Sequence, residues 1–240
     1  MSTISNIIIN NALFGIVISL IAYEIGVLLY RKTNLPIFNP LLIAIILVIG
    51  FLLVFHISFK TYNDGARFIN LFLAPSTVVL AVPLYKQIDR LKENAIPIFV
   101  GIICGSGGGI ISILLLSHFV GLDKKMIASL MAKSVTTPIA ISVTAELHGL
   151  VPVTVLAVIT TGIIGAIIQP FITKIFRIKN KIAVGLCLGT SSHAVGTTKA
   201  LEIGETEGAM SSLAIGVNGI ITVILAPIIF SLGMAIFAII

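Results

Sequence analysis

Six stretches of the chain are each apolar over about the length that a helix needs to cross a lipid bilayer. They lie near residues 6–30, 37–56, 66–85, 95–118, 151–173 and 209–236. A bilayer core about 30 Å thick requires roughly 20 apolar residues in a helix. A soluble fold of 240 residues could not bury this much apolar surface, since 58% of the residues are hydrophobic and only 10% are charged. The sequence therefore predicts an all-α integral membrane protein.

Lysine and arginine outnumber aspartate and glutamate by 15 to 9. This excess does not indicate a nucleic-acid partner, because the basic residues form short clusters between apolar runs, where they set membrane topology. We expect the protein in the plasma membrane, with the lipid bilayer as its surroundings and no nucleic acid bound. The clusters follow the first, third and fifth apolar stretches: Arg31/Lys32, Lys86/Arg90/Lys92 and Lys174/Arg177/Lys179/Lys181.

Two further segments, 126–147 and 182–201, are apolar but are interrupted midway by small and polar residues. If both cross the bilayer fully, 6 basic residues lie inside and 9 outside. If each segment enters and leaves on one face, the four residues of the cluster from Lys174 to Lys181 move inward and the numbers become 10 and 5. The positive-inside rule favours the second topology. We therefore expect about six transmembrane helices plus two re-entrant broken-helix hairpins, with both termini outside.

The two interrupted segments belong to an internal repeat. A shift of 56 residues places Ser134 on Thr190, and a shift of 57 places residues 161–170 on 218–227. One hairpin plus one span contains an odd number of crossings, so the second copy inserts upside down, as in many secondary transporters. The expected organisation is a single membrane domain over 1–240, with a four-helix part at 1–118 and inverted repeats at 125–176 and 181–238.

The interruptions carry hydroxyl and basic side chains that could bind a ligand. Thr137 before Pro138 predicts the start of a half-helix with free N–H groups at membrane depth. Two such helix N-termini, with a cation at Lys133 or His193, would attract a small carboxylate. The predicted substrate-binding residues are Lys133, Ser134, Thr136, Thr137, Thr190, Ser191, Ser192, His193, Thr197 and Asn218.

Each of these residues also has a structural alternative. Hydroxyls in membrane helices often bond back to nearby carbonyl groups, and Asn218 could join two helices. Lys133 could extend to the outer face, and His193 could be a neutral core residue bonded to a backbone carbonyl. The alternatives remain open at this point.

Other features of the spans are expected to be structural. Gly101, Gly105 and Gly109 favour close helix packing over a ligand role. A kink is at least as plausible as a binding role for the segment 75–77, and we expect Glu202, Glu205 and Glu207 on a solvated loop. The spans hold no nucleophile, paired carboxylates or metal-ligand cluster, so we expect no enzyme, no cofactor and no metal. A proton carried by His193 is a more plausible coupling ion than sodium, because no aspartate lies at mid-membrane.

The runs KSVTTPIAISVTAELHG and ITTGIIGAIIQP, and the stretch from Ile178 that contains GTSSHAVGTTKALE, resemble the LrgB/CidB family of antiholin-like membrane proteins. The resemblance covers nearly all of the chain and is strongest after residue 125. The family includes the C-terminal half of the chloroplast glycolate/glycerate translocator, and bacterial relatives are linked to pyruvate uptake. Other members are named for holin-like control of murein hydrolases and autolysis, with a small LrgA/CidA-type membrane partner.

The resemblance therefore implies two different functions. We expect carriage of a small monocarboxylate such as pyruvate, glycolate or glycerate by alternating access. The alternative is an antiholin-like regulator of murein hydrolase activity and autolysis that acts with an LrgA/CidA-type partner. The doubled GxxxG spacing of the fourth span would serve such an interface. A homo-oligomer is expected in either case, with a dimer favoured.

Overall fold

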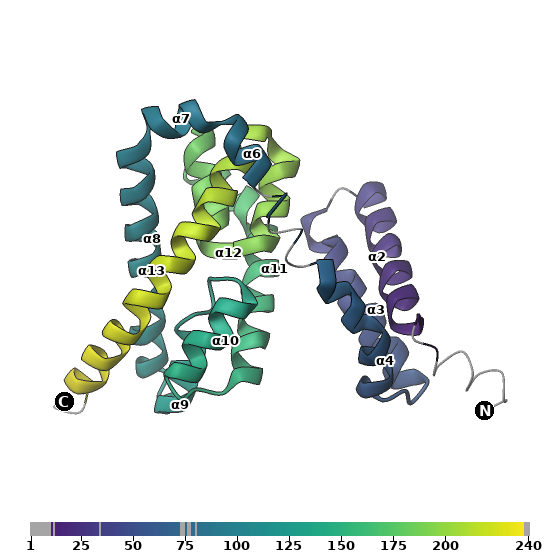
Figure 1. The fold of residues 1–240 in the computed structure, drawn as a ribbon. Coiled ribbons are helices and arrows are strands. Elements are labelled where there is room, and N and C mark those ends of the chain that lie inside the picture. The colour runs from purple at the N-terminus through teal and green to yellow at the C-terminus, as the bar shows by residue number, and fades with distance from the viewer. Residues whose placement is uncertain are drawn as a thin grey trace. The chain divides into compact units, whose positions relative to one another are not determined.

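The computed structural model describes residues 11, 13–33, 35–72, 75, 78–79 and 81–237, and its regular elements there are all helices (Figure 1). This confirms the expected all-α class for the described residues. The chain forms two compact units, one ending at Val79 and the other continuing to the C-terminus. Among the described residues, four helices are long and apolar enough to span a membrane: α2 (Phe14–Thr33), α8 (Ala95–Phe119), α11 (Val151–Ile175) and α13 (Glu205–Phe237).

The first unit is built around α2, which packs against α3 (Pro40–Val54) and α4 (Phe59–Ala66). Helix α3 begins where it does because the Asn39 side chain accepts hydrogen bonds from the backbone N–H groups of the first turn, at 3.0 and 3.3 Å. Gly15 and Gly26 of α2 lie where a β-carbon would meet the backbone of α4 and α3. The helices of this unit therefore approach at glycine positions.

The expected third span, 66–85, is divided among several elements. Within this stretch a short 3-10 helix, η2 (Arg67–Phe72), follows α4. Another 3-10 helix, η1 (Pro36–Phe38), lies earlier in the chain, before α3. Ser76 and Thr77 lie outside the described residues, and α6 (Ala81–Lys86) and α7 (Ile88–Glu93) then lead into α8.

The second unit consists of α8, α11 and α13 together with the two interrupted segments. Helix α8, part of the expected N-terminal region 1–118, packs against α13 and α12 in this unit. The first segment forms α9 (Lys124–Leu130) and α10 (Thr137–Glu146), with residues 131–136 between them in turns. Thr136 occupies the N-cap position of α10. The sequence predicts Thr137 as this N-cap, so the half-helix starts one residue earlier than predicted.

The second segment, α12 (Lys181–Ile203), reverses its direction at His193. The backbone of His193 has φ 42° and ψ −133°, a left-handed region that favours glycine. A β-carbon on Gly196 would collide with the carbonyl oxygen of Leu188, although the two residues would be about 12 Å apart along a straight helix. Residues 181–192 (the first leg) and 193–203 (the second leg) therefore lie antiparallel.

The tip of α12 packs against α11. The Nε2 atom of His193 donates a hydrogen bond of 2.9 Å to the carbonyl oxygen of Val158. A β-carbon on Gly162 would lie 2.7 Å from Cε1 of His193, and one on Gly165 would collide with the Ser192 hydroxyl. Two glycines of α11 thus make the room that this tip occupies.

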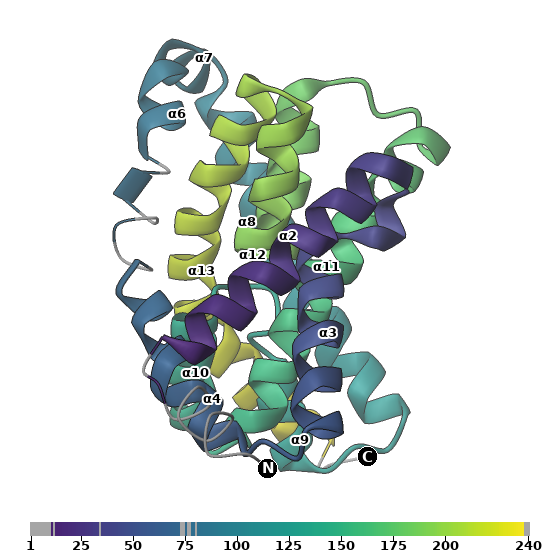
Figure 2. The same ribbon diagram turned by 90° about the vertical axis from the view of Figure 1, so that its right-hand side faces the viewer.

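The tip of the first segment packs against α13, the long helix that follows the second segment. The side-chain amide of Asn218 donates a hydrogen bond of 2.9 Å to the carbonyl oxygen of Ser134. Ile139 lies over Gly219, where a β-carbon would be 2.7 Å from its Cδ1 atom. Each tip therefore contacts the long helix that follows the other segment. Helices α9 and α10 lie at one end of this unit and α12 at the other (Figure 1 and Figure 2).

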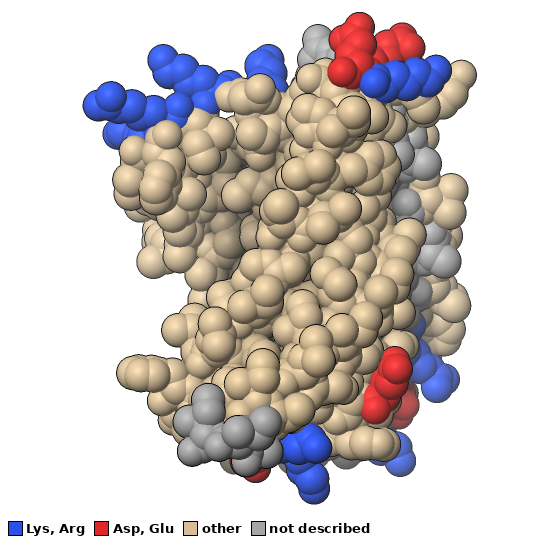
Figure 3. Space-filling model, turned by 90° about the vertical axis from the view of Figure 1, so that its left-hand side faces the viewer, with Lys and Arg blue, Asp and Glu red and all other residues tan. Residues whose placement is uncertain are grey.

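Charged side chains gather near the two ends of the face formed by α8 and α13, and the band between them is free of charge (Figure 3). At one end Lys86 of α6 pairs with Glu205 at 3.8 Å. Between the ends α8 and α13 expose large apolar side chains such as Ile103, Ile111 and Ile220. Such a contiguous apolar surface marks an interaction with a membrane or a protein.

The Gly165 contact yields a stability test. We expect Gly165→Ala to lower the free energy of unfolding by about 1–3 kcal/mol, because the added methyl group displaces Ser192 from α11. Gly216→Ala is the matched control, since a β-carbon there meets nothing within 4 Å and alanine is the better helix former. Unfolding of both variants in detergent micelles would measure the difference, and equal stability of the two would contradict the described packing.

Candidate functional site

A cavity of about 550 Å³ lies between α8, the turns after α9, the first leg of α12 and α13. One face of α8 forms its longest wall, with Asn94 at one limit and Ile113 at the other. The lining positions on α8 recur three or four residues apart, as one side of a helix does. At 1.5 Å per residue, this wall is about 28 Å long.

Three glycines of α8 face this cavity. A β-carbon on Gly101 would lie 3.8 Å from Leu186, and one on Gly105 would lie 3.5 Å from Thr190. A β-carbon on Gly109 would meet nothing within 4 Å. The tight helix contact expected of a doubled GxxxG spacing is therefore not formed here. Because glycine has no side chain, these three positions instead add to the volume of the cavity.

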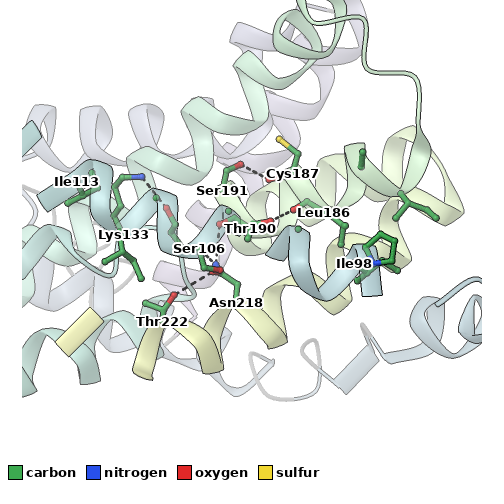
Figure 4. A pocket seen from close by; sticks show the side chains of 18 of the residues that line it. Ile98, Ser106, Ile113, Lys133, Leu186, Cys187, Thr190, Ser191, Asn218 and Thr222 are labelled. Atoms are coloured by element: carbon green, nitrogen blue, oxygen red, sulfur yellow. Dashed lines mark hydrogen bonds between the residues drawn. The ribbon is translucent and has the colours of Figure 1, made fainter. Parts of the chain in front are cut away.

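Lys133 is the one charged residue among the described residues that line the cavity. Its Nζ atom donates a hydrogen bond of 3.0 Å to the Ser134 hydroxyl (Figure 4). An ammonium group has three donors, and no carboxylate in the described part of the chain forms an ion pair with it. Lys133 thus lies on the cavity instead of extending to the outer face.

Asn218 joins both tips at the centre of the site, with 1% of its surface exposed. Its Nδ2 atom donates to the carbonyl oxygens of Ser134 at 2.9 Å and Thr190 at 3.1 Å. Its Oδ1 atom accepts hydrogen bonds from Ser106 of α8 and, at 3.5 Å, from Thr222 of α13. Asn218 therefore joins helices, as its structural alternative predicts. The same residue also borders the cavity.

The hydroxyl groups of the first leg bond back within their own helix. The Thr190 hydroxyl donates to the carbonyl oxygen of Leu186, and the Ser191 hydroxyl donates to that of Cys187 at 2.7 Å. Their hydroxyl protons therefore form hydrogen bonds within the leg, as hydroxyl groups in membrane helices often do. The Lys133 ammonium is left as the strongest donor available to an anion in the cavity.

The structure brings half of the ten predicted site residues to this cavity. Ser192 and His193 lie against α11, and the Thr197 hydroxyl bonds to Ser211 at 2.7 Å. Thr136 and Thr137 stand at the start of α10 and do not line the cavity. The predicted half-helix start at Thr137 therefore does not line it. The lining residues among the ten are Lys133, Ser134, Thr190, Ser191 and Asn218.

Other lining residues were not among the predicted ten. Ser106 and Gly109 belong to the glycine-rich part of α8, and Cys187 lies one helical turn before Ser191. A polar serine inside the GxxxG pattern was the available signal for this wall. Both cysteines are exposed and only Cys187 lines the cavity, but nothing in the local sequence distinguishes it from Cys104.

The expectation that Glu207 lies on a solvated loop was wrong. Glu207 is 6% exposed, and its Oε2 atom has no hydrogen-bond partner among the described residues. The reversal at His193 is the reason, because it returns the chain to the first leg of α12, where a β-carbon on Gly185 would collide with the backbone of Glu207. Glu202 and Glu205 are exposed as expected.

The chain matches the model of the LrgB-like family over residues 19–232. The chain belongs to this family. The antiholin-like protein LrgB of Bacillus cereus (strain B4264) is 40% identical over 215 residues, which cover 89% of this chain and 94% of that protein. The antiholin-like protein LrgB of Bacillus anthracis (strain A0248) has the same identity and coverage. No solved structure matches the chain significantly.

LrgB-like membership confirms the resemblance carried by the run GTSSHAVGTTKALE. Together with the four long apolar helices, it makes the chain a multi-pass membrane protein. Since the residues that line the cavity run from Asn94 to Thr222, the cavity lies within the region that this chain shares with the family.

Asn218 provides a test of the site's architecture. We expect Asn218→Ala to lower the free energy of unfolding by at least about 1–3 kcal/mol, because two buried carbonyl oxygens lose their donor. Thr198→Ala is the control, since Thr198 is exposed and its hydroxyl donates to the carbonyl oxygen of Ala194 in its own helix. Denaturant titration in micelles would compare the two, and a loss no larger than that of the control would show that Asn218 does not hold the tips.

Proposed function

We propose that this chain is an antiholin-like membrane protein that restrains autolysis, together with a small LrgA/CidA-type membrane partner. The observation that carries this proposal is the 40% identity to antiholin-like proteins over almost the full length of both chains. The plasma membrane is the location that such a role requires.

Removal of the gene from its host tests this role. We expect the cells to lyse faster after an autolysis trigger, and the wild-type chain to restore the slower rate when it is supplied again. Culture turbidity against time measures the effect. An unchanged lysis rate in cells that contain the partner would contradict the antiholin-like role.

A second candidate, carriage of a small monocarboxylate, is favoured by one observation on the molecule. The cavity holds a single charged group, the Lys133 ammonium, and no protein carboxylate among the described residues pairs with it. A half-buried cation without a carboxylate partner among the described residues favours an anionic ligand, because pairing offsets part of the free-energy cost of its burial. Ionisable groups at membrane depth are also typical of transport pathways.

The arrangement of the two broken segments supports an inverted repeat of re-entrant hairpins. Their tips approach from opposite ends of the second unit and share Asn218. Thr154 and Ser211, which the 57-residue shift superposes, also play similar parts. The Thr154 hydroxyl bonds to the hydroxyl of Thr144 at 2.9 Å, and the Ser211 hydroxyl bonds to that of Thr197 at 2.7 Å.

The distribution of lysines supports an orientation in the membrane. The end of the unit where α12 begins and the cavity reaches Asn180 carries several basic residues, among them Lys86, Lys92, Lys174, Arg177, Lys179 and Lys181, whereas the other end carries Lys124 and Lys125. By the positive-inside rule the first of these ends is cytoplasmic. The cavity then opens inward, and alternating access requires a second state open on the other side. Proton coupling through His193 stays a prediction.

Transport is tested by replacing the cavity's cation. We expect Lys133→Met to abolish uptake of labelled pyruvate into proteoliposomes, because the carboxylate loses its only charged partner. Lys133→Arg should retain part of the uptake, and Lys125→Met should retain all of it, since Lys125 is exposed on α9. Uptake by Lys133→Met at the wild-type rate would contradict this site.

The same variant separates the two candidate functions in cells. If carriage of an acid underlies the control of lysis, Lys133→Met will fail to restore slow lysis even though it reaches the membrane in normal amount. Full restoration by this variant would show that the antiholin-like role does not use the cavity.

A further inference from the structure

The cavity is larger than a three-carbon acid requires. A water molecule occupies about 30 Å³ in the liquid, so the six non-hydrogen atoms of pyruvate take up at most about 180 Å³ at that density. This is about a third of the 550 Å³ cavity. Cavities of about 300–1,000 Å³ usually enclose ligands with an extended apolar body.

The space beside Lys133 is apolar. Ile110 and Ile113 of α8 and Met131 line the cavity near this lysine, and Figure 4 shows Ile113 next to its side chain. Gly109 leaves open space on the same wall. A carboxylate bound to Lys133 therefore has an apolar compartment within reach of the rest of its molecule.

We propose that the cavity binds amphipathic monocarboxylates, with the carboxylate on Lys133 and an apolar body of up to about ten carbon atoms along the α8 wall. This inference rests on the proposed carrier function and names the class of acid that its site prefers. Transfer of each methylene group from water into such a compartment tightens binding about three- to fourfold. Octanoate should therefore bind on the order of 100-fold more tightly than butyrate.

Binding can be measured without transport through a thiol placed in the apolar compartment, at Ile113, which lines the cavity. The chain has two cysteines, so Cys104→Ser and Cys187→Ser together leave Ile113→Cys as the only thiol. A bound acid should slow the alkylation of this thiol by a maleimide in micelles. The concentrations of butyrate, hexanoate and octanoate that halve the alkylation rate give their relative affinities. Octanamide, which has the same chain and no charge, should not protect.

Two adjacent glycines provide matched variants for the apolar compartment. A β-carbon on either Gly108 or Gly109 meets nothing within 4 Å, but only Gly109 lines the cavity. We expect Gly109→Leu to weaken protection by octanoate at least tenfold while protection by butyrate changes little. Gly108→Leu should leave both unchanged, and Lys133→Met should remove protection by both acids.

The outcomes separate this inference from the proposed function. Equal protection by butyrate and octanoate overturns the preference for amphipathic acids and leaves carriage of small acids standing. Protection by octanamide as strong as by octanoate also overturns it, because the carboxylate would then play no part. Absence of protection by every acid, pyruvate included, overturns the inference and the carrier function together.

Discussion

One buried amide, that of Asn218, satisfies backbone carbonyl groups that two broken helices leave open at the same depth. The hydrocarbon interior of a membrane supplies no water to such groups, so an interrupted helix is stable there only where protein completes its hydrogen bonds. Asn218 does this for Ser134 and Thr190 together and is itself held by Ser106. The tips can therefore meet without filling the space between them, and the cavity beside Lys133 is the result.

The long helices could be predicted closely because length and apolar composition alone determine them. The expected spans 95–118, 151–173 and 209–236 correspond to α8, α11 and α13. The breaks were also visible, since polar residues at membrane depth need partners. The division of 66–85 was not visible, because its mean hydropathy resembles that of a span. Whether this segment forms one helix or several depends on contacts with other parts of the chain, which the hydropathy of the segment does not reveal.

The site was harder to predict than the fold, because neighbouring residues on a helix point about 100° apart. The repeat drew attention to residues 190–193, yet Thr190 and Ser191 line the cavity while Ser192 and His193 face α11. The direction of the reversal at His193 decides which of these two pairs faces the cavity and which faces α11. The same reversal buries Glu207, which looks solvated in the sequence.

The crossed docking of the tips has a consequence for the biogenesis of the protein. Ser134 and the amide that satisfies it are 84 residues apart in the chain. At a synthesis rate of about 5–20 residues per second, the ribosome needs about 4–17 s to make the intervening chain. The first broken segment therefore leaves the ribosome before its partner exists. The second unit assembles as a whole after its last helix has been translated, instead of repeat by repeat.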